Sequence, residues 1–166
     1  IYGDLSGGAE RLSLIYTPNP LELNNQSVTN QSAVAEIIYS SLVKNVDRQI
    51  SQGMTVVGPH RDDIQFLIGG RDMGIYGSRG QQRSIVAALK LAEAKFMVSK
   101  TGEDPVLLLD DVLSELDSPR RSHILQKAMT NQQTIVTTTN MEAMDNSFIS
   151  SARVFKVSEG TISVGS

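Results

Sequence analysis

Residues 106–111 read Val-Leu-Leu-Leu-Asp-Asp, and this stretch decides the fold. The four residues before Asp110 are all apolar, so a strand built from them would be buried on both faces. That pattern is typical of a central parallel strand covered by helices. The strand would place Asp110 and Asp111 at its carboxyl end, where many α/β folds hold Mg²⁺ beside a nucleotide. Taken alone, such an acidic pair is more often solvated or caps the next turn.

The chain after this stretch alternates between helix and strand signals. Ser118 and Pro119 predict a helix that begins with an N-cap followed by proline at its first position. The predicted buried face of this helix consists of Ile124, Leu125, Ala128 and Met129. A β-branched run over residues 134–138 predicts a strand, and residues 153–158 and 161–164, on either side of a Glu-Gly pair, predict a terminal hairpin.

The chain before the acidic stretch shows a similar alternation. Residues 11–16 and 63–68 predict strands, with Gly69-Gly70 as a tight turn and residues 72–76 as the hairpin partner of the second strand. A loop rich in Asn and Gln precedes a helix whose apolar residues recur every fourth position, namely Val34, Ile38, Leu42, Val46 and Ile50. Ile37 widens that stripe, so we expect the helix to pack on a large surface. A longer helix of roughly twenty residues then presents one apolar face, formed by Ile85, Leu89, Ala92 and Phe96.

Together these elements predict an α/β fold with a mostly parallel sheet, flanking helices and a terminal β-hairpin. At 166 residues, 40% of them hydrophobic, the chain is expected to form a single domain or lobe over residues 1–166. The net charge of -3 disfavours a surface that coats nucleic acid all over, while a local basic patch stays open. The absence of cysteine and of long apolar runs favours a cytoplasmic protein, and the first residue, Ile1, suggests a piece of a longer chain.

Residues 78–83, Ser-Arg-Gly-Gln-Gln-Arg, stand where the longest predicted helix begins. Backbone N–H groups at a helix N-terminus attract anions, and the missing side chain of Gly80 leaves them accessible. Together with the hydroxyl of Ser78, these groups form a candidate γ-phosphate site. A plain helix N-cap is the alternative interpretation.

Two other charged clusters have a structural as well as a functional interpretation. Residues 60–63, His-Arg-Asp-Asp, resemble a hydrolase or metal site, but we expect a surface turn in which Arg61 pairs with Asp63. A positive patch that faces nucleotide or DNA is the second candidate, with a solvated surface as its alternative. Its residues would be Arg71, Arg79 and Arg83.

The order and spacing of three segments resemble the ATPase heads of the ABC type. Residues 78–83 resemble the signature motif, residues 106–111 the Walker B strand, and residues 114–117, Ser-Glu-Leu-Asp, the D-loop. The segments most similar to the RecF family of SMC-like DNA-repair ATPases are residues 58–63, 77–83 and 107–117. This similarity extends from about residue 7 to residue 160, and it implies the C-terminal lobe of a P-loop NTPase head.

The resemblance implies a role for each motif residue. Asp110 would bind Mg²⁺, and Asp111 would take the place of the glutamate that orients the hydrolytic water in most ABC ATPases. Asp117 would couple the two ATP sites of a dimer. Ser78, Gly80 and Gln81 would contact the γ-phosphate of ATP bound to the opposite protomer. The other residues implied to lie at a nucleotide are Arg79, Asp117 and Thr138.

The chain departs from the family pattern in two places. Thr138 follows the predicted strand at the switch position, where transporter ATPases carry histidine. The phosphate-binding sequence Gly-x-x-x-x-Gly-Lys-Ser/Thr does not occur in the 166 residues. We therefore expect this chain by itself to bind ATP weakly and to hydrolyse none.

For the whole protein, the resemblance implies a DNA-dependent ATPase that forms an ATP-dependent homodimer with Mg²⁺ as cofactor. The implied partners are double-stranded DNA and single-strand junctions, RecR and the RecA pathway. The implied processes are recombination, gap repair, replication and the SOS response to DNA damage. Two other classes stay open, namely the nucleotide-binding subunit of an ABC transporter and a non-catalytic interaction module.

Overall fold

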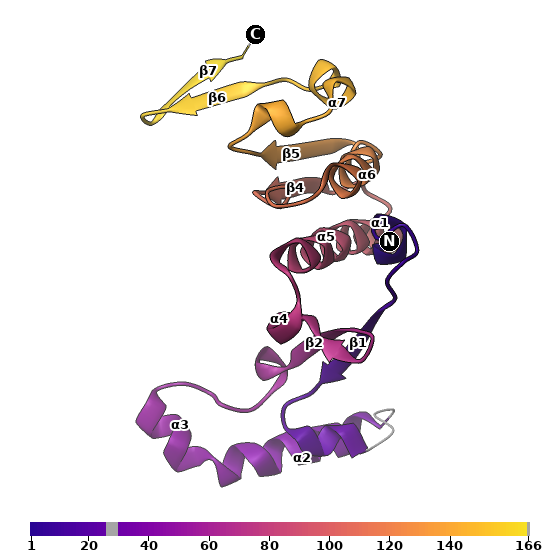
Figure 1. The fold of residues 1–166 in the computed structure, drawn as a ribbon. Coiled ribbons are helices and arrows are strands. Elements are labelled where there is room, and N and C mark those ends of the chain that lie inside the picture. Colours follow the sequence, from indigo (N-terminus) through magenta and orange to yellow (C-terminus); the bar gives the residue numbers. More distant parts are fainter. Residues whose placement is uncertain (26–29, 166) are drawn as a thin grey trace. The chain divides into compact units, whose positions relative to one another are not determined.

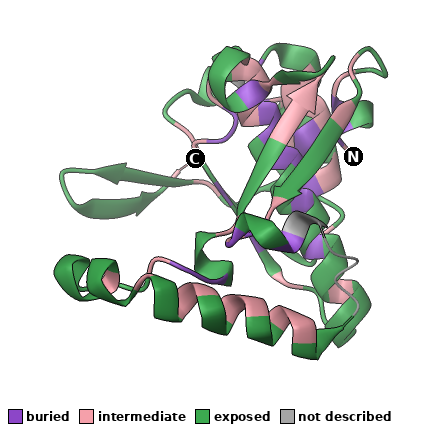
Figure 2. Cartoon of the chain, turned by 90° about the horizontal axis from the view of Figure 1, so that it is seen from below, coloured by how far each residue is buried: buried purple, intermediate pink, exposed green. Residues whose placement is uncertain are grey.

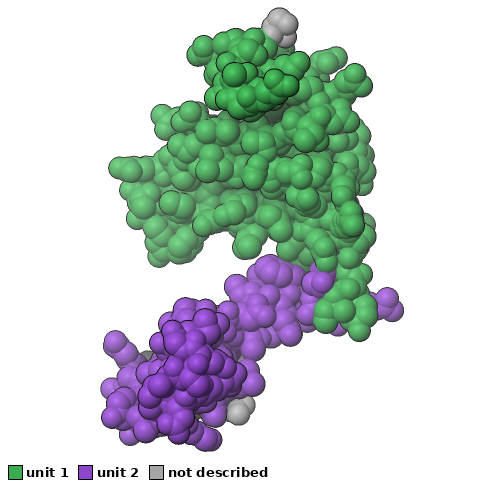
Figure 3. All heavy atoms as spheres, turned by 90° about the vertical axis from the view of Figure 1, so that its left-hand side faces the viewer, with its two compact units in different colours: residues 1–12, 75–166 green, residues 13–74 purple. Residues whose placement is uncertain are grey.

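The structure is a computed structural model that describes residues 1–25 and 30–165 (Figure 1). The chain divides into two compact units, which Figure 3 colours separately. The first, here called the motif unit, comprises Ile1–Leu12 and Ile75–Ser166, and the second, the insert unit, comprises Ser13–Gly74. Within the described residues, no helix is long and apolar enough to cross a membrane. The assignment of the whole chain as one lobe of an ATPase head stays a prediction.

The motif unit is built around the long helix α5, Arg79–Thr101. This helix contacts α1 (Tyr2–Leu5), α6 (Ser118–Ala128) and strand β4 (Val106–Asp110). It ends at Gly102, whose φ of 75° gives the left-handed C-cap that residues with a Cβ rarely adopt. The largest fully buried side chains of the unit are Leu109, Leu113, Ile124, Leu125 and Ser84.

The buried face of α5 differs from the predicted one. Leu89, Ala92 and Phe96, which were expected inside, are exposed. The residues that α5 buries are Ser84, Ile85, Ala87, Ala88, Leu91 and Ala94. Ile85 is buried as predicted, and from there the buried stripe continues through Ala88 and Leu91, at helical spacings of three, and not through Leu89 and Ala92.

Strand β4 pairs in parallel with β5, Gln133–Thr137, which confirms the α/β fold and a parallel strand at the acidic pair. Leu107 and Leu109 are buried, whereas Val106 and Leu108 are exposed. The prediction of burial on both faces is therefore wrong for the part of the chain that the structure describes. The alternation is that of a strand covered by packed side chains on one face.

Helix α6 begins one residue earlier than the sequence pattern indicated. Asp117 is its N-cap, since Asp117 Oδ1 accepts a hydrogen bond from Arg120 N at 2.9 Å. Ser118 is then the first helical residue, and Pro119 follows inside the first turn, where its missing N–H is not needed. Met129 lies at the C-cap and is exposed, so its predicted place on the buried face is wrong.

The C-terminal part of the motif unit contains short elements and the predicted hairpin. Strands β6 (Phe155–Ser158) and β7 (Thr161–Val164) pair antiparallel, which confirms the hairpin. The turn residues Glu159 and Gly160 have φ of 49° and 75°, as a tight two-residue hairpin turn requires. The 3₁₀ helix η3 (Met141–Ala143) and helix α7 (Asn146–Ser151) precede the hairpin. These two elements were not predicted.

The sheet of the insert unit has the strand order β1-β2-β3. Strands β1 (Leu12–Thr17) and β2 (Asp63–Ile68) confirm the two predicted strands. Strand β3 spans Arg71–Asp72, and residues Met73–Tyr76 form the short helix α4. The predicted hairpin partner is therefore cut to two residues, because Asp72 Oδ1 accepts from Gly74 N at 2.7 Å and turns the chain.

The predicted helix with an apolar residue at every fourth position is two helices, α2 (Gln31–Lys44) and α3 (Val46–Gln52). Asn45 separates them, and its Nδ2 donates to Ser41 O at 2.8 Å, which satisfies a carbonyl at the end of α2. Neither helix has a buried residue among the described positions, and Figure 2 shows both helices in pink and green only. The expected packing on a large surface is therefore not seen in the described chain. The Asn- and Gln-rich loop includes residues 26–29, which lie outside the described residues.

The remaining elements are the 3₁₀ helices η1 (Leu21–Asn25) and η2 (Pro59–Arg61).

Candidate functional site

The N-terminus of α5 is closed by a capping box. Ser78 Oγ accepts from Gln81 N at 3.2 Å, and Gln81 Oε1 accepts from Ser78 N at 3.0 Å. A hydroxyl both donates and accepts, so Ser78 still carries an O–H for a ligand. The first-turn N–H groups of Arg79 and Gly80 have no intrahelical acceptor, and the dipole of a 23-residue helix is positive at this end. The structure thus shows the helix N-cap, and the anion site at the same helix end stays a prediction.

Gly80 permits a close approach between the signature and D-loop segments. A Cβ at position 80 would lie 3.3 Å from the main-chain oxygen of Glu115. Ser84, one turn further along α5, is buried and donates its hydroxyl to Gly80 O at 2.8 Å. The glycine therefore serves the packing of the two motifs against each other, in addition to leaving the N–H groups accessible.

Asp110 is held by a residue that the sequence interpretation did not single out. Thr137 Oγ1 donates to Asp110 Oδ1 at 2.6 Å and accepts from Asp111 N at 3.0 Å. The β4–β5 register places Thr137 directly beside Asp110. The predicted switch residue Thr138 lies one residue past β5, and its Oγ1 accepts from Asn140 N at 3.1 Å within its own turn.

The carboxylate of Asp110 suits a magnesium ion bound beside a nucleotide. Its second oxygen has no hydrogen-bond or ion-pair partner among residues 1–25 and 30–165. Among the same residues, no group of three or more His, Cys, Asp or Glu side chains is placed so that it could bind a metal ion together. Magnesium at nucleotide sites is typically held by one or two carboxylates, with phosphates and water completing the octahedron. The donor set therefore fits a metal that arrives with its nucleotide.

Asp111 adopts an unusual backbone conformation at the end of β4. Its φ is 50°, a region that aspartate tolerates better than most residues with a Cβ. Arg83 Nη1 donates to Asp111 O at 2.7 Å, and Arg83 Nη2 lies 3.3 Å from Asp111 Oδ2. Ser114 Oγ also donates to Asp111 O, at 2.9 Å. Arg83 of α5 thus restrains both the main chain and the carboxylate of Asp111, and Ser114 restrains its main chain.

Of the three arginines in the predicted positive patch, the two that lie in the motif unit, Arg79 and Arg83, each form an ion pair. Arg79 Nη1 lies 3.2 Å from Glu115 Oε1, with the arginine side chain 84% exposed. Arg83 pairs with Asp111, and Arg71 belongs to the insert unit. Exposed pairs of this kind contribute at most about 1 kcal/mol. Arg83 therefore joins the start of α5 to the end of β4, and Arg79 joins it to the loop at residues 114–117.

An acidic residue outside the motifs was missed by the sequence interpretation. Glu10 Oε1 accepts from Gln81 Nε2 at 2.8 Å, and Glu10 Oε2 accepts from Tyr2 OH at 2.6 Å. The hydrogen bond from Tyr2 holds the pKa of Glu10 below its ordinary value, whereas burial and the same hydrogen bond raise the pKa of Tyr2. The residues around the adjoining hollow of about 450 Å³ are Glu10, Ser78, Gly80, Gln81, Glu115, Leu116, Asp117 and Arg120.

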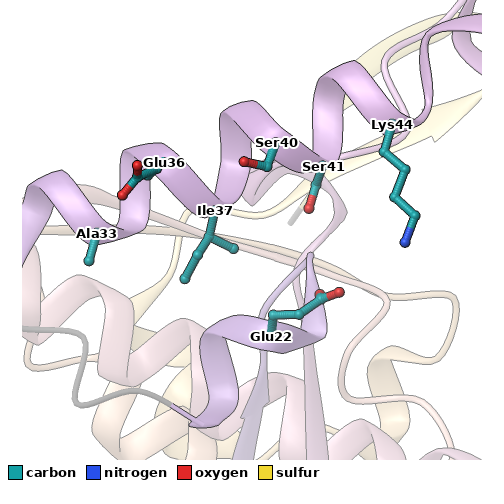
Figure 4. A pocket seen from close by; sticks show the side chains of 7 residues that line it. All are labelled: Glu22, Ala33, Glu36, Ile37, Ser40, Ser41 and Lys44. Atoms are coloured by element: carbon teal, nitrogen blue, oxygen red, sulfur yellow. The ribbon is translucent and has the colours of Figure 1, made fainter.

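The insert unit contains none of the predicted nucleotide residues. Its hollow, between η1 and α2, is lined by Glu22, Ala33, Glu36, Ile37, Ser40, Ser41 and Lys44 (Figure 4). The turn at residues 60–63 is structural, but the expected pairing of Arg61 with Asp63 is wrong in the described chain. Arg61 Nε donates instead to Thr55 O at 3.2 Å, and Asp62 accepts from the hydroxyl of Tyr16.

The fold and the site together define the class. A parallel strand ending in two carboxylates, the capped helix that begins at residues 78–83 and the loop at 114–117 meet in one compact unit, which is the arrangement of an ABC-type ATPase head. No family model matches the chain. Comparison with individual proteins identifies the relatives as RecF, and over nearly its whole length the chain is homologous to the C-terminal part of RecF proteins.

The similarity is consistent across distant bacteria and in structure. The chain is 41% identical to the DNA replication and repair protein RecF of Staphylococcus epidermidis over 162 residues, which are 98% of this chain and 43% of the relative. It is 45% identical to RecF of Roseiflexus castenholzii over 163 residues, which are 96% of this chain and 40% of the relative. The solved structure of the recombination mediator protein RecF with ATP superposes with a TM-score of 0.65 at 33% identity, covering 99% of this chain and 41% of that one. The chain therefore spans about two fifths of the length of these relatives.

Proposed function

We propose that this chain supplies one half of a composite ATP site in a RecF-like recombination mediator. Asp110 holds Mg²⁺, and Asp111 orients the attacking water. The N-terminus of α5, with Ser78, Gly80 and Gln81, contacts the γ-phosphate of ATP whose other phosphates are bound by a second protomer. Arg79 and Thr138 lie at the border of the same site, and Asp117 couples the two sites of the dimer.

The observation that carries this proposal is the junction between α5 and the segment after β4. Arg83 binds Asp111, Arg79 pairs with Glu115, and Gly80 lies against the Glu115 carbonyl. These contacts hold the start of α5 against the segment that follows β4. Phosphoryl transfer depends on positioning and charge stabilisation, so the proposed roles require the positive helix end, the metal ligand and the water-orienting carboxylate to be held in fixed places.

For the whole protein, we propose ATP-dependent dimerisation on DNA, with RecR and RecA-dependent gap repair as the setting. The names of the relatives support this, since they are DNA replication and repair proteins and a recombination mediator in the RecFOR pathway. A cytoplasmic location fits the same setting. The position of Thr138, where transporter ATPases carry histidine, disfavours the transporter alternative.

Sedimentation of the full-length protein that carries this chain, with and without Mg-ATP, tests the proposal. Ser78→Asp keeps an N-cap acceptor but places a negative charge where the γ-phosphate would lie, so the ATP-dependent dimer should be lost. Ser78→Asn is the matched control, because it keeps the cap without the charge and should retain most of the dimer. A wild-type protein that stays monomeric with Mg-ATP would favour the non-catalytic interaction module.

A further inference from the structure

A carboxylate outside the three motifs connects the signature segment with the D-loop segment. We propose that Glu10 is a positioning residue that couples the start of α5 to Asp117 at the start of α6. The coupling rests on the proposed function, because it links the helix end that is proposed to contact the γ-phosphate with Asp117, which is proposed to couple the two ATP sites of the dimer. Glu10 itself touches no reacting group.

The two oxygens of Glu10 serve two different elements. Oε1 accepts the hydrogen bond from Gln81 Nε2 in α5. Oε2 lies 3.6 Å from Arg120 Nη2 in α6. Arg120 in turn contacts Asp117, through its Nε at 3.7 Å and through its main-chain N–H at 2.9 Å. An unbroken series of polar contacts therefore runs from Gln81 through Glu10 and Arg120 to Asp117.

Both the main chain and the carboxylate of Glu10 are held by neighbouring residues of the N-terminal segment. Its main-chain N–H donates to Ser6 Oγ at 3.3 Å, and Ser6 Oγ lies 3.2 Å from Glu10 O. Tyr2, which is buried, fixes the carboxylate from α1. A side chain that is already ordered loses little conformational entropy when it holds its partners. Glu10 is thus a preformed link and not a flexible surface acid.

The contact with Gln81 fixes the orientation of a side chain in the signature motif. Gln81 Oε1 accepts from Ser78 N, so Nε2 faces Glu10. Reversing the amide would place its oxygen against a carboxylate oxygen and its NH₂ against an N–H group. The Gln81 amide is therefore locked in one orientation as long as Glu10 is charged and in place.

The contact with Arg120 is better shielded than the other ion pairs of the motif unit. The side chains of Glu10 and Arg120 are each 22% exposed, whereas those of Arg79 and Glu115 are 84% and 44% exposed. Water screens the Glu10–Arg120 pair less, so its geometry is held more strongly. The link therefore has a defined geometry at both of its ends.

Hydrogen exchange in the full-length protein that carries this chain tests the link without nucleotide. In Glu10→Ala, amide exchange should rise about tenfold in both segments, residues 79–83 and 117–121, because both lose a support. In Glu10→Gln, which can still accept from Gln81 but loses the ion pair, residues 117–121 should respond more than residues 79–83. A response confined to residues 79–83 in both variants would overturn the proposal.

Asp4→Asn provides the matched control. It removes the ion pair between α1 and α6, Asp4 with Lys127 at 3.5 Å, without touching Gln81 or Arg120. Exchange in the two segments should stay at the wild-type rate. An equal response to Asp4→Asn would show that any loosening of α1 has the same effect, and Glu10 would then have no specific role.

Dimerisation with Mg-ATP provides the functional readout. Glu10→Ala should raise the dimer dissociation constant about tenfold, within the usual range of coupling between sites, and Asp4→Asn should leave it unchanged. If Glu10→Ala forms the dimer with the same dissociation constant as the wild-type protein, the proposed coupling is overturned. A wild-type protein that forms no dimer would overturn the proposed function instead, and the exchange pattern would still decide whether Glu10 links the two motifs.

Discussion

Arg83 in α5 binds Asp111 at two points, with Nη1 donating to the main-chain oxygen at 2.7 Å and Nη2 lying 3.3 Å from the carboxylate. The contact joins the residue after β4 to helix α5. The side chains of Arg83 and Asp111 are 37% and 50% exposed, so water screens their charges. Restraint of geometry is therefore the main consequence of the pair.

Replacing Arg83 should affect ATP turnover far more than stability. In the full-length protein, Arg83→Ala should lower turnover by about ten- to a hundredfold, because a small displacement of Asp111 misaligns the water. The free energy of unfolding should fall by about 1 kcal/mol or less. Lys90→Ala, which breaks the exposed Lys90–Glu93 pair on the same helix, is the control and should leave turnover unchanged. Equal turnover in both variants would contradict the positioning role.

Replacing Gly80 should reveal the close contact between the signature and D-loop segments. Glycine to alanine inside a helix normally stabilises by about 0.4–1 kcal/mol. Gly3→Ala, in α1 with no atom within 4 Å of the added Cβ, should show this gain. Gly80→Ala should not, because its Cβ meets the Glu115 oxygen at 3.3 Å. Denaturant unfolding of the two variants compares them, and an equal gain would exclude the crowding.

The N-cap of α6 can be located by two alanine substitutions. Asp117→Ala removes the acceptor for Arg120 N and should cost about 1 kcal/mol in the free energy of unfolding. Ser118→Ala changes a residue inside the first turn and should stay within about 0.5 kcal/mol of wild type. Urea unfolding distinguishes the two. A larger loss for Ser118→Ala would restore the sequence-based assignment of the cap.

The Tyr2–Glu10 hydrogen bond should make stability depend on pH at both extremes. The pKa of Glu10 is lowered on folding, so its contribution is complete above the ordinary glutamate pKa of about 4.3 and is lost as the pH falls through the lower folded value. The pKa of Tyr2 is raised, so its contribution is complete below the ordinary tyrosine pKa of about 10 and is lost at higher pH.

Urea midpoints measured across the pH range test this dependence. Glu10→Gln should flatten the acid side of the profile, and Tyr2→Phe should flatten the alkaline side. Tyr16, whose pKa is also raised, chiefly by its hydrogen bond to Asp62, adds to the alkaline side, so Tyr16→Phe is the comparison there. Profiles of the Glu10 and Tyr2 variants that match wild type would show that their hydrogen bond does not contribute to stability.

Local chemistry explains why some elements were predicted correctly and others were not. The strand at residues 63–68 matches β2 because its ends are marked by a turn and a glycine pair. The apolar pattern across α2 and α3 continues past Asn45, although the helix ends there. The side chain of Asn45 bonds to a main-chain carbonyl and ends α2, and hydrophobic periodicity carries no information about such a contact. The buried face of α5 was assigned correctly only at Ile85, because apolar residues occur around much of this helix and the spacing alone does not decide which stripe packs inside.

The sequence by itself determined the motifs, their order and their location at strand and helix ends, because capping, turns and hydrophobic period act over a few residues. The tertiary structure alone decided which side chains meet. Thr137 reaches Asp110 through the register of a parallel pair, and Glu10 reaches Gln81 across 71 positions of the chain. Such contacts depend on how helices and strands pack, and a lone acid such as Glu10 leaves no periodic or local signal that would reveal them.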